Sequence, residues 1–91
     1  MRDLFEIEEY LAREASPRIA QAQTDRILAK VESLGDLPTL GAQRRDLGAG
    51  RRLAVAAPYV ILYSEIAGEV HVLRIAHGAR DLPTLLRDTP G

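Results

Sequence analysis

Three basic side chains, Arg74, His77 and Arg80, lie close together near the end of the chain. Arginine offers a planar set of donors for phosphates or carboxylates, and histidine can give or take a proton near neutral pH. Beside Tyr63, this set could hold a phosphodiester, with the histidine as acid or base and the arginines stabilising the charge. The residues alone favour a structural alternative, in which His77 bonds a main-chain carbonyl at a strand end and Arg80 pairs with Asp81.

Other chemistries have little support. His71 and His77 fall on one predicted strand, about 20 Å apart at ~3.3 Å per residue, so they cannot share a metal ion. The glycines at 48–50 precede a strand rather than a helix, so they do not form a phosphate loop. The chain contains no cysteine, which excludes disulfides and thiolate metal sites. We therefore expect no metal and no cofactor.

The charge distribution is explained either by a surface for an acidic partner or phosphates, or by ordinary solvated charge. Residues 1–36 carry eight acidic and five basic side chains, whereas residues 37–91 carry five acidic and seven basic ones, all arginine. The net charge of −1 argues against direct, sequence-specific DNA binding by this chain. No apolar run approaches the ~20 residues that span a membrane, and no signal segment opens the chain, so a cytoplasmic protein is expected.

Two helices are predicted to pack on one face of the sheet that carries these basic side chains. Apolar residues at helical spacing predict a helix over 3–14. Ser16 and Pro17 are typical of a helix start, and Gly35 of a helix end, so residues 3–34 form a helix hairpin. The helix residues expected to meet the sheet are Leu4, Ile7, Leu11, Ile27, Val31 and Leu34.

The second half predicts three strands, 52–56, 59–66 and 70–77, because its apolar runs are rich in β-branched residues and are separated by turn residues. The fold class is therefore α+β, an αα-hairpin packed on a three-stranded antiparallel sheet. One domain, 1–91, contains these segments in order: helix hairpin 3–34, loop 35–51, sheet 52–77 and tail 78–91.

Both faces of the middle strand are apolar, but the helices can cover only one. Val60, Leu62 and Ile66 alternate with the residues that face the helices. An uncovered apolar face usually marks a binding surface. We therefore expect either a partner on this face or self-association of the isolated chain.

This order of elements, with these residues, resembles the RelE/ParE superfamily of toxins from type II toxin–antitoxin modules, over roughly residues 3–81. The resemblance is carried by Asp3-Leu4, Ile7 and Tyr10-Leu11-Ala12, Pro17, Ile27, Val31 and Leu34, Pro38 and Gly41, Gly50-Arg51-Arg52-Leu53, Tyr59-Val60-Ile61-Leu62-Tyr63, and Leu73-Arg74-Ile75-Ala76-His77-Gly78-Ala79-Arg80-Asp81. Members usually begin with a β-strand before the first helix, whereas here Met1 stands almost at that helix. We therefore expect an open sheet edge, which invites pairing with another chain.

The ending His-Gly-Ala-Arg-Asp, with no tyrosine after the last strand, is more similar to ParE-type toxins than to RelE-like ribonucleases. The resemblance implies a protein-binding toxin that inhibits DNA gyrase, is neutralised by a ParD-like antitoxin, and acts in growth arrest and plasmid stabilisation. The residues expected to contact the target or the antitoxin are Arg52, Tyr63, Arg74, His77 and Arg80. The alternatives are a RelE-like ribosome-dependent mRNA endonuclease and a non-toxic, antitoxin-binding remnant. The ribonuclease site would comprise Arg51, Arg74, His77 and Arg80.

Overall fold

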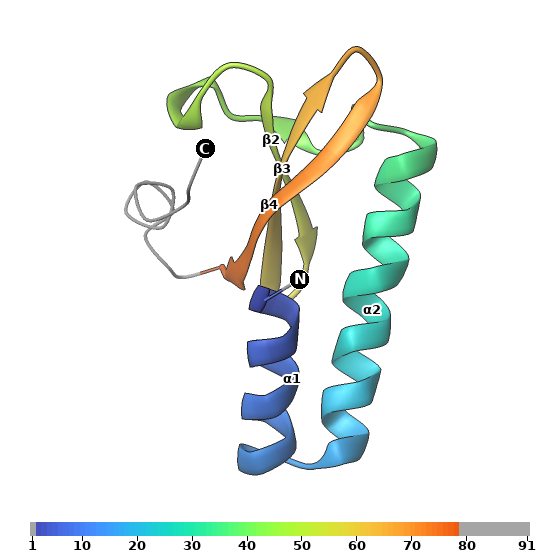
Figure 1. Ribbon diagram of the computed structural model, residues 1–91, viewed down its shortest axis with the longest axis vertical. Coiled ribbons are helices and arrows are strands. Elements are labelled where there is room, and N and C mark those ends of the chain that lie inside the picture. The colour runs from blue at the N-terminus through green and yellow to red at the C-terminus, as the bar shows by residue number, and fades with distance from the viewer. Residues whose placement is uncertain (1, 79–91) are drawn as a thin grey trace.

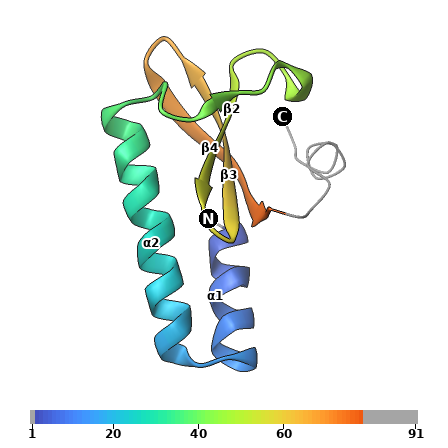
Figure 2. The same cartoon turned by 180° about the vertical axis from the view of Figure 1, so that it is seen from behind.

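The computed structural model describes residues 2–78, and these form a helix hairpin that packs on one face of an antiparallel sheet (Figure 1). Helix α1 spans Arg2–Glu14 and helix α2 spans Pro17–Asp36. Ser16 caps α2, because its hydroxyl accepts a hydrogen bond from the Ile19 N–H at 3.1 Å. The predicted hairpin is confirmed, and its closed end projects beyond the sheet (Figure 2).

The sheet has four strands among the described residues, in the order β1-β2-β3-β4. They are β1 (Ala42–Gln43), β2 (Arg51–Ala56), β3 (Tyr59–Ile66) and β4 (Glu69–His77). The α+β class and the antiparallel meander are confirmed. The additional strand, β1, lies in the segment that the sequence analysis assigned to a loop. It is only two residues long, so its side chains carry no alternating pattern that would predict it.

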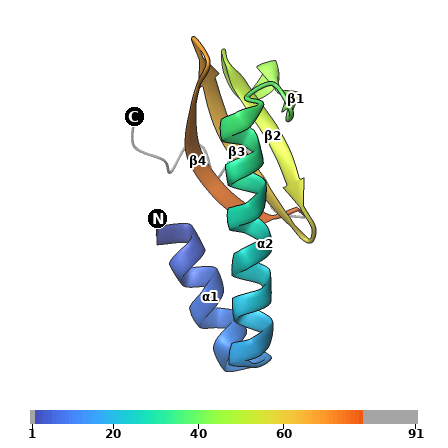
Figure 3. The same ribbon diagram turned by 90° about the vertical axis from the view of Figure 1, so that its right-hand side faces the viewer.

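The main core lies between the helices and the sheet. Figure 3 shows α2 in front of the sheet. Ile27 and Leu34 of α2 pack against Ile61 and Tyr63 of β3, and all four side chains are fully buried. The other helix residues predicted to face the sheet pack against this cluster and are partly buried: Leu4, Ile7, Leu11 and Val31. The helix stripe therefore meets the sheet as predicted.

The opposite face of the sheet is not bare. Val60 and Leu62 are buried in a second cluster with Leu47, which belongs to a short 3-10 helix, η1 (Arg45–Leu47). The expectation of an uncovered apolar face is therefore wrong for Val60 and Leu62, because part of the predicted loop folds back over them. Ile66, at the end of β3, is 60% exposed.

A bulge in β4 changes which side chains share a face. Leu62 pairs with Arg74 but Tyr63 pairs with Val72, so Leu73 is the additional residue. Val72 consequently packs in the helix-side cluster with Ile75, whereas Leu73 packs in the opposite one. Strict alternation of side chains along β4 predicts that Val72 shares a face with Ala76 and that Leu73 shares a face with Ile75. Both predictions are wrong because of the bulge.

Replacing Ile27 tests the main core. Ile27→Ala should lower the free energy of unfolding by about 2–5 kcal/mol, because it opens a cavity among fully buried side chains. Urea denaturation provides the measurement. The matched control is the next residue of the same helix, Leu28→Ala, which removes a side chain that is 49% exposed and should cost far less. Equal losses for the two variants would contradict the described packing.

Candidate functional site

Arg74, the central residue of the predicted basic set, is bound by a carboxylate. Its Nε lies 2.7 Å from Asp3 Oδ2, and its Nη2 lies 3.2 Å from Asp3 Oδ1. The Ile75 N–H also donates to Asp3 Oδ2, at 2.9 Å. Both side chains are mostly buried, with 23% of Arg74 and 12% of Asp3 exposed. This charge-assisted fork ties the start of α1 to β4, so Arg74 has a structural role.

His77 lies at the end of β4, opposite Tyr59 of β3. The two rings meet edge to face, with centroids 5.9 Å apart and planes at 78°. Burial raises the pKa of the Tyr59 phenol above its usual value. Arg80 and Asp81 lie outside the described residues. The structure therefore describes only Arg74 and His77 of the predicted basic set, and each contacts a neighbouring element.

Arg52 and Tyr63 are paired across β2 and β3, and both hold the segment that connects α2 to the sheet. The Tyr63 hydroxyl donates to the Pro38 carbonyl at 2.7 Å and accepts from the Gly41 N–H at 2.9 Å. Arg52 Nη1 donates to the Gly41 carbonyl at 2.8 Å. Tyr63 is fully buried. Its hydroxyl therefore positions this segment, and its contact with a target or antitoxin stays a prediction.

The approach of Gly41 to Tyr63 is close enough to require glycine. A Cβ at position 41 would lie 2.7 Å from the Tyr63 hydroxyl oxygen, which is shorter than any ordinary contact. Nearby, Arg44 forms a two-point ion pair with Asp46 at 2.8–2.9 Å, and its hydrogen bonds lower the pKa of the Asp46 carboxyl. Arg51 begins β2 and is partly exposed. Much of the positive charge around β2 thus serves the local structure.

The two histidines stand apart on β4, His71 opposite Ser64 and His77 opposite Tyr59. Within residues 2–78, no three histidine, cysteine or acidic side chains gather where they could hold a metal ion. In the same range, neither helix has the length and apolar character needed to cross a membrane.

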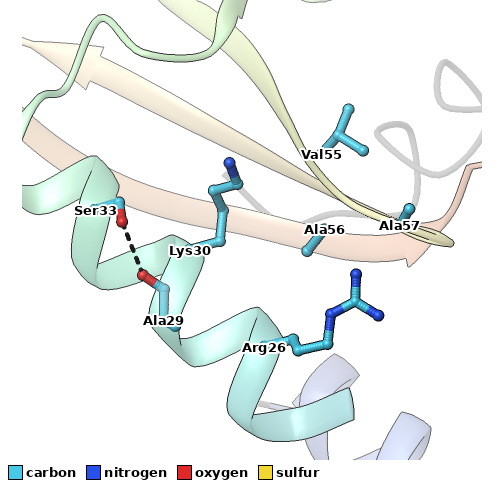
Figure 4. A pocket seen from close by; sticks show the side chains of 7 residues that line it. All are labelled: Arg26, Ala29, Lys30, Ser33, Val55, Ala56 and Ala57. Carbon is cyan, nitrogen blue, oxygen red and sulfur yellow. Dashed lines mark hydrogen bonds between the residues drawn. The ribbon is translucent and has the colours of Figure 1, made fainter. Parts of the chain in front are cut away.

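A groove between α2 and the end of β2 is lined by two basic side chains (Figure 4). Its volume is about 490 Å³. Arg26 and Lys30 of α2 extend toward β2, and neither forms an ion pair with another described residue. Ala56 is buried at its floor, and Val55 is 58% exposed at its edge.

The sequence analysis missed the groove because it looked for basic residues on the strands. A usable signal exists: Arg26 and Lys30 are four residues apart, so they lie on one side of a helix, next to the apolar stripe that meets the sheet. We define the α2–β2 groove by its seven lining residues, Arg26, Ala29, Lys30, Ser33, Val55, Ala56 and Ala57.

Comparison with known proteins gives a consistent result. A family model described as the ParE toxin of the type II toxin–antitoxin system parDE matches residues 1–82. Toxin RelE2 of Caulobacter vibrioides is 38% identical over 80 residues, which cover 88% of each protein. Toxin ParE3 of the same organism is 35% identical over 69 residues, which cover 76% of this chain and 69% of that protein.

A solved structure shares the fold. A chain from the structure described as the chromosomal ParDE TA system from P. aeruginosa superposes with a TM-score of 0.70. The match covers 84% of each chain at 23% sequence identity.

Removing Asp3 tests the structural role of Arg74. Asp3→Ala should lower the free energy of unfolding by about 2–3 kcal/mol, somewhat less than for a fully buried pair, because Arg74 keeps limited solvent access. The control is Glu6→Ala in the same helix, which removes the partner of Arg2 in an exposed pair and should have almost no effect. Chemical denaturation measures both, and an Asp3→Ala loss no larger than that of Glu6→Ala would refute the role.

Removing one oxygen tests the positioning role of Tyr63. Tyr63→Phe leaves the Pro38 carbonyl and the Gly41 N–H without their partner, and should cost about 1–3 kcal/mol. Tyr10→Phe is the control, because Tyr10 is 55% exposed on α1. Thermal unfolding should show a lower midpoint for Tyr63→Phe only. Unchanged midpoints in both variants would mean that the hydroxyl does not anchor this segment.

Proposed function

The chain belongs to the ParE toxin family of type II toxin–antitoxin systems, and from this premise we propose that it arrests growth by binding DNA gyrase. In this proposal it acts in the cytoplasm as a protein-binding inhibitor, and a ParD-like antitoxin encoded beside it neutralises it. Plasmid stabilisation follows where such a pair is carried on a plasmid.

The family match over residues 1–82 carries the proposal, because it includes every helix and strand that the structure describes. The geometry supports a binding role rather than catalysis. Arg74 is neutralised by Asp3, and Arg52 is directed at main-chain carbonyls. An endonuclease of the predicted kind needs guanidinium groups that contact the reacting phosphate, whereas these two contact protein groups.

A second candidate, a RelE-like ribosome-dependent mRNA endonuclease, is favoured by one observation: a relative 38% identical over 80 residues is called Toxin RelE2. Its site would comprise Arg51, Arg74, His77 and Arg80. For this chemistry, Arg74 would have to exchange the carboxylate of Asp3 for a phosphate. Asp3→Ala should then keep or raise the activity per folded molecule, whereas Arg74→Ala should abolish it.

Inducible expression with two molecular readouts distinguishes the candidates. We expect growth arrest, altered plasmid supercoiling and gyrase-linked DNA breaks, all relieved when the neighbouring gene is co-expressed. Ribosome-bound mRNA, mapped by primer extension in the same cells, should stay intact. The destabilised Ile27→Ala variant is the control for effects of overexpression.

Other outcomes have distinct meanings. Growth arrest with normal gyrase activity and cut mRNA would replace the gyrase proposal with the ribonuclease one. Soluble expression without growth arrest would show that the chain only binds its antitoxin.

A further inference from the structure

Three polar side chains form a row across three strands, near the turn between β3 and β4. Arg51 of β2 pairs with Ser64 of β3, and Ser64 pairs with His71 of β4. Directly paired residues share a face of a sheet, with their Cβ atoms about 5 Å apart. The polar row, defined as Arg51, Ser64 and His71, therefore brings a guanidinium, a hydroxyl and an imidazole together.

The polar row lies on the face of the sheet that points away from the helices. Side chains alternate along a strand, and Leu62, two residues before Ser64, belongs to the cluster opposite the helices. Leu53 and Leu73, which stand at the same spacing from the row on the other two strands, pack against that cluster as well. The polar row therefore borders this apolar cluster on the same face.

The side chains of the row form no hydrogen bond or ion pair with any other residue of the range 2–78. For Ser64 this is unusual, because it is only 8% exposed and a buried hydroxyl normally has a partner. Within the same range, the Gln23 amide nitrogen is the one fully enclosed side-chain polar atom without a hydrogen bond. The unbonded Ser64 oxygen therefore keeps some contact with solvent, where a small ligand can reach it.

Two glycines shape the surroundings of this hydroxyl. A Cβ at position 50 would lie 3.8 Å from the Ser64 hydroxyl oxygen, so Gly50 leaves that side of the oxygen uncrowded. A Cβ at position 48 would lie only 3.1 Å from the Arg51 Cγ. The arginine stem thus lies against the main chain that follows η1, which restricts where its guanidinium starts.

All three side chains can donate hydrogen bonds to an anion. Arginine donates through a planar fork, serine through its O–H, and histidine through one N–H when neutral and two when protonated. A phosphate group has several strong acceptor oxygens that point in different directions, so it can accept from all three side chains at once. β2 and β4 are about 10 Å apart, at ~4.8 Å per strand spacing, so a phosphate above Ser64 can be reached from both.

We infer that the polar row binds a phosphate group, with Arg51 as its charged partner and Ser64 and His71 as further donors. Two sources carry such a group, a free nucleotide and a nucleic-acid backbone. The inference goes beyond the proposed function, because it requires neither gyrase nor an antitoxin. The site also differs from that of the ribonuclease candidate, which includes Arg51 but neither Ser64 nor His71.

A titration with inorganic phosphate tests the charged partner. Phosphate is added to the isotope-labelled full chain at constant ionic strength, and NMR follows the main-chain amides. The signals of residues 50–52, 63–65 and 70–72 should shift and then saturate. Arg51→Gln should weaken binding about tenfold, because it removes the charge-assisted hydrogen bonds. The matched control is Arg18→Gln, an exposed arginine of α2, which should bind like the wild type.

The hydroxyl is tested without disturbing the fold. Ser64→Ala removes a group that bonds no described residue, so the midpoint of thermal unfolding should stay the same while phosphate binding weakens about three- to tenfold. Ser33→Ala is the control, because the Ser33 hydroxyl bonds the Ala29 carbonyl within α2 and should not affect phosphate binding. Ser64→Ala also supplies a second measurement if Arg51→Gln unfolds.

The same titration with adenosine monophosphate and with a short single-stranded DNA separates the two sources. Tighter binding of the DNA, weakened by Arg51→Gln and Ser64→Ala, would assign the site to a nucleic-acid backbone. Tighter binding of the nucleotide, weakened by the same variants, would assign it to a free nucleotide.

Three results would overturn the inference and leave the proposed function intact. The first is the absence of saturable shifts at the polar row with inorganic phosphate. The second is phosphate binding that neither Arg51→Gln nor Ser64→Ala weakens. The third is an equal loss of binding in Arg18→Gln, which would reveal a diffuse attraction of anions rather than a site.

Discussion

The ion pair between Asp3 and Arg74 fixes the start of the first helix against β4. Helix α1 has no fully buried side chain, so apolar packing alone positions it weakly. Arg74 is mostly buried on β4, where a guanidinium without a partner is costly. Asp3, 71 residues away in sequence, supplies that partner and also accepts from the Ile75 N–H. The start of α1 is thereby attached to β4, while Ile27 and Leu34 anchor α2 on the sheet.

This arrangement divides the basic residues into two groups. Arg74 and Arg52 hold elements together, one through α1 and the other through the segment after α2. Arg26 and Lys30 extend from α2 into the α2–β2 groove and make no ion pair within residues 2–78. The groove therefore holds positive charge that no described carboxylate neutralises. The basic groups that hold the fold together are therefore separate from those that line the groove.

Local patterns predicted most of the fold, whereas contacts between distant residues could not be predicted. Helical spacing and the Ser16 cap gave the hairpin, and β-branched runs gave the three longer strands. The bulge at Leu73 depends on the register with β3, which no single strand reveals. The pair Asp3–Arg74 joins opposite ends of the chain, and Asp3 is equally explained as a favourable charge at a helix start. The sequence does not distinguish a tyrosine whose hydroxyl contacts a partner protein from one, such as Tyr63, whose hydroxyl bonds a main-chain carbonyl.

Amide hydrogen exchange, measured on the wild-type chain and on the Asp3→Ala variant, tests the central claim most directly. The account predicts that Asp3→Ala speeds exchange at Ile75, whose N–H loses its acceptor, and at the start of α1, which loses its link to β4. Exchange in the middle of α2 should stay the same, because Ile27 and Leu34 anchor that helix in the main core. Unchanged exchange at Ile75 and at the start of α1 would contradict the account.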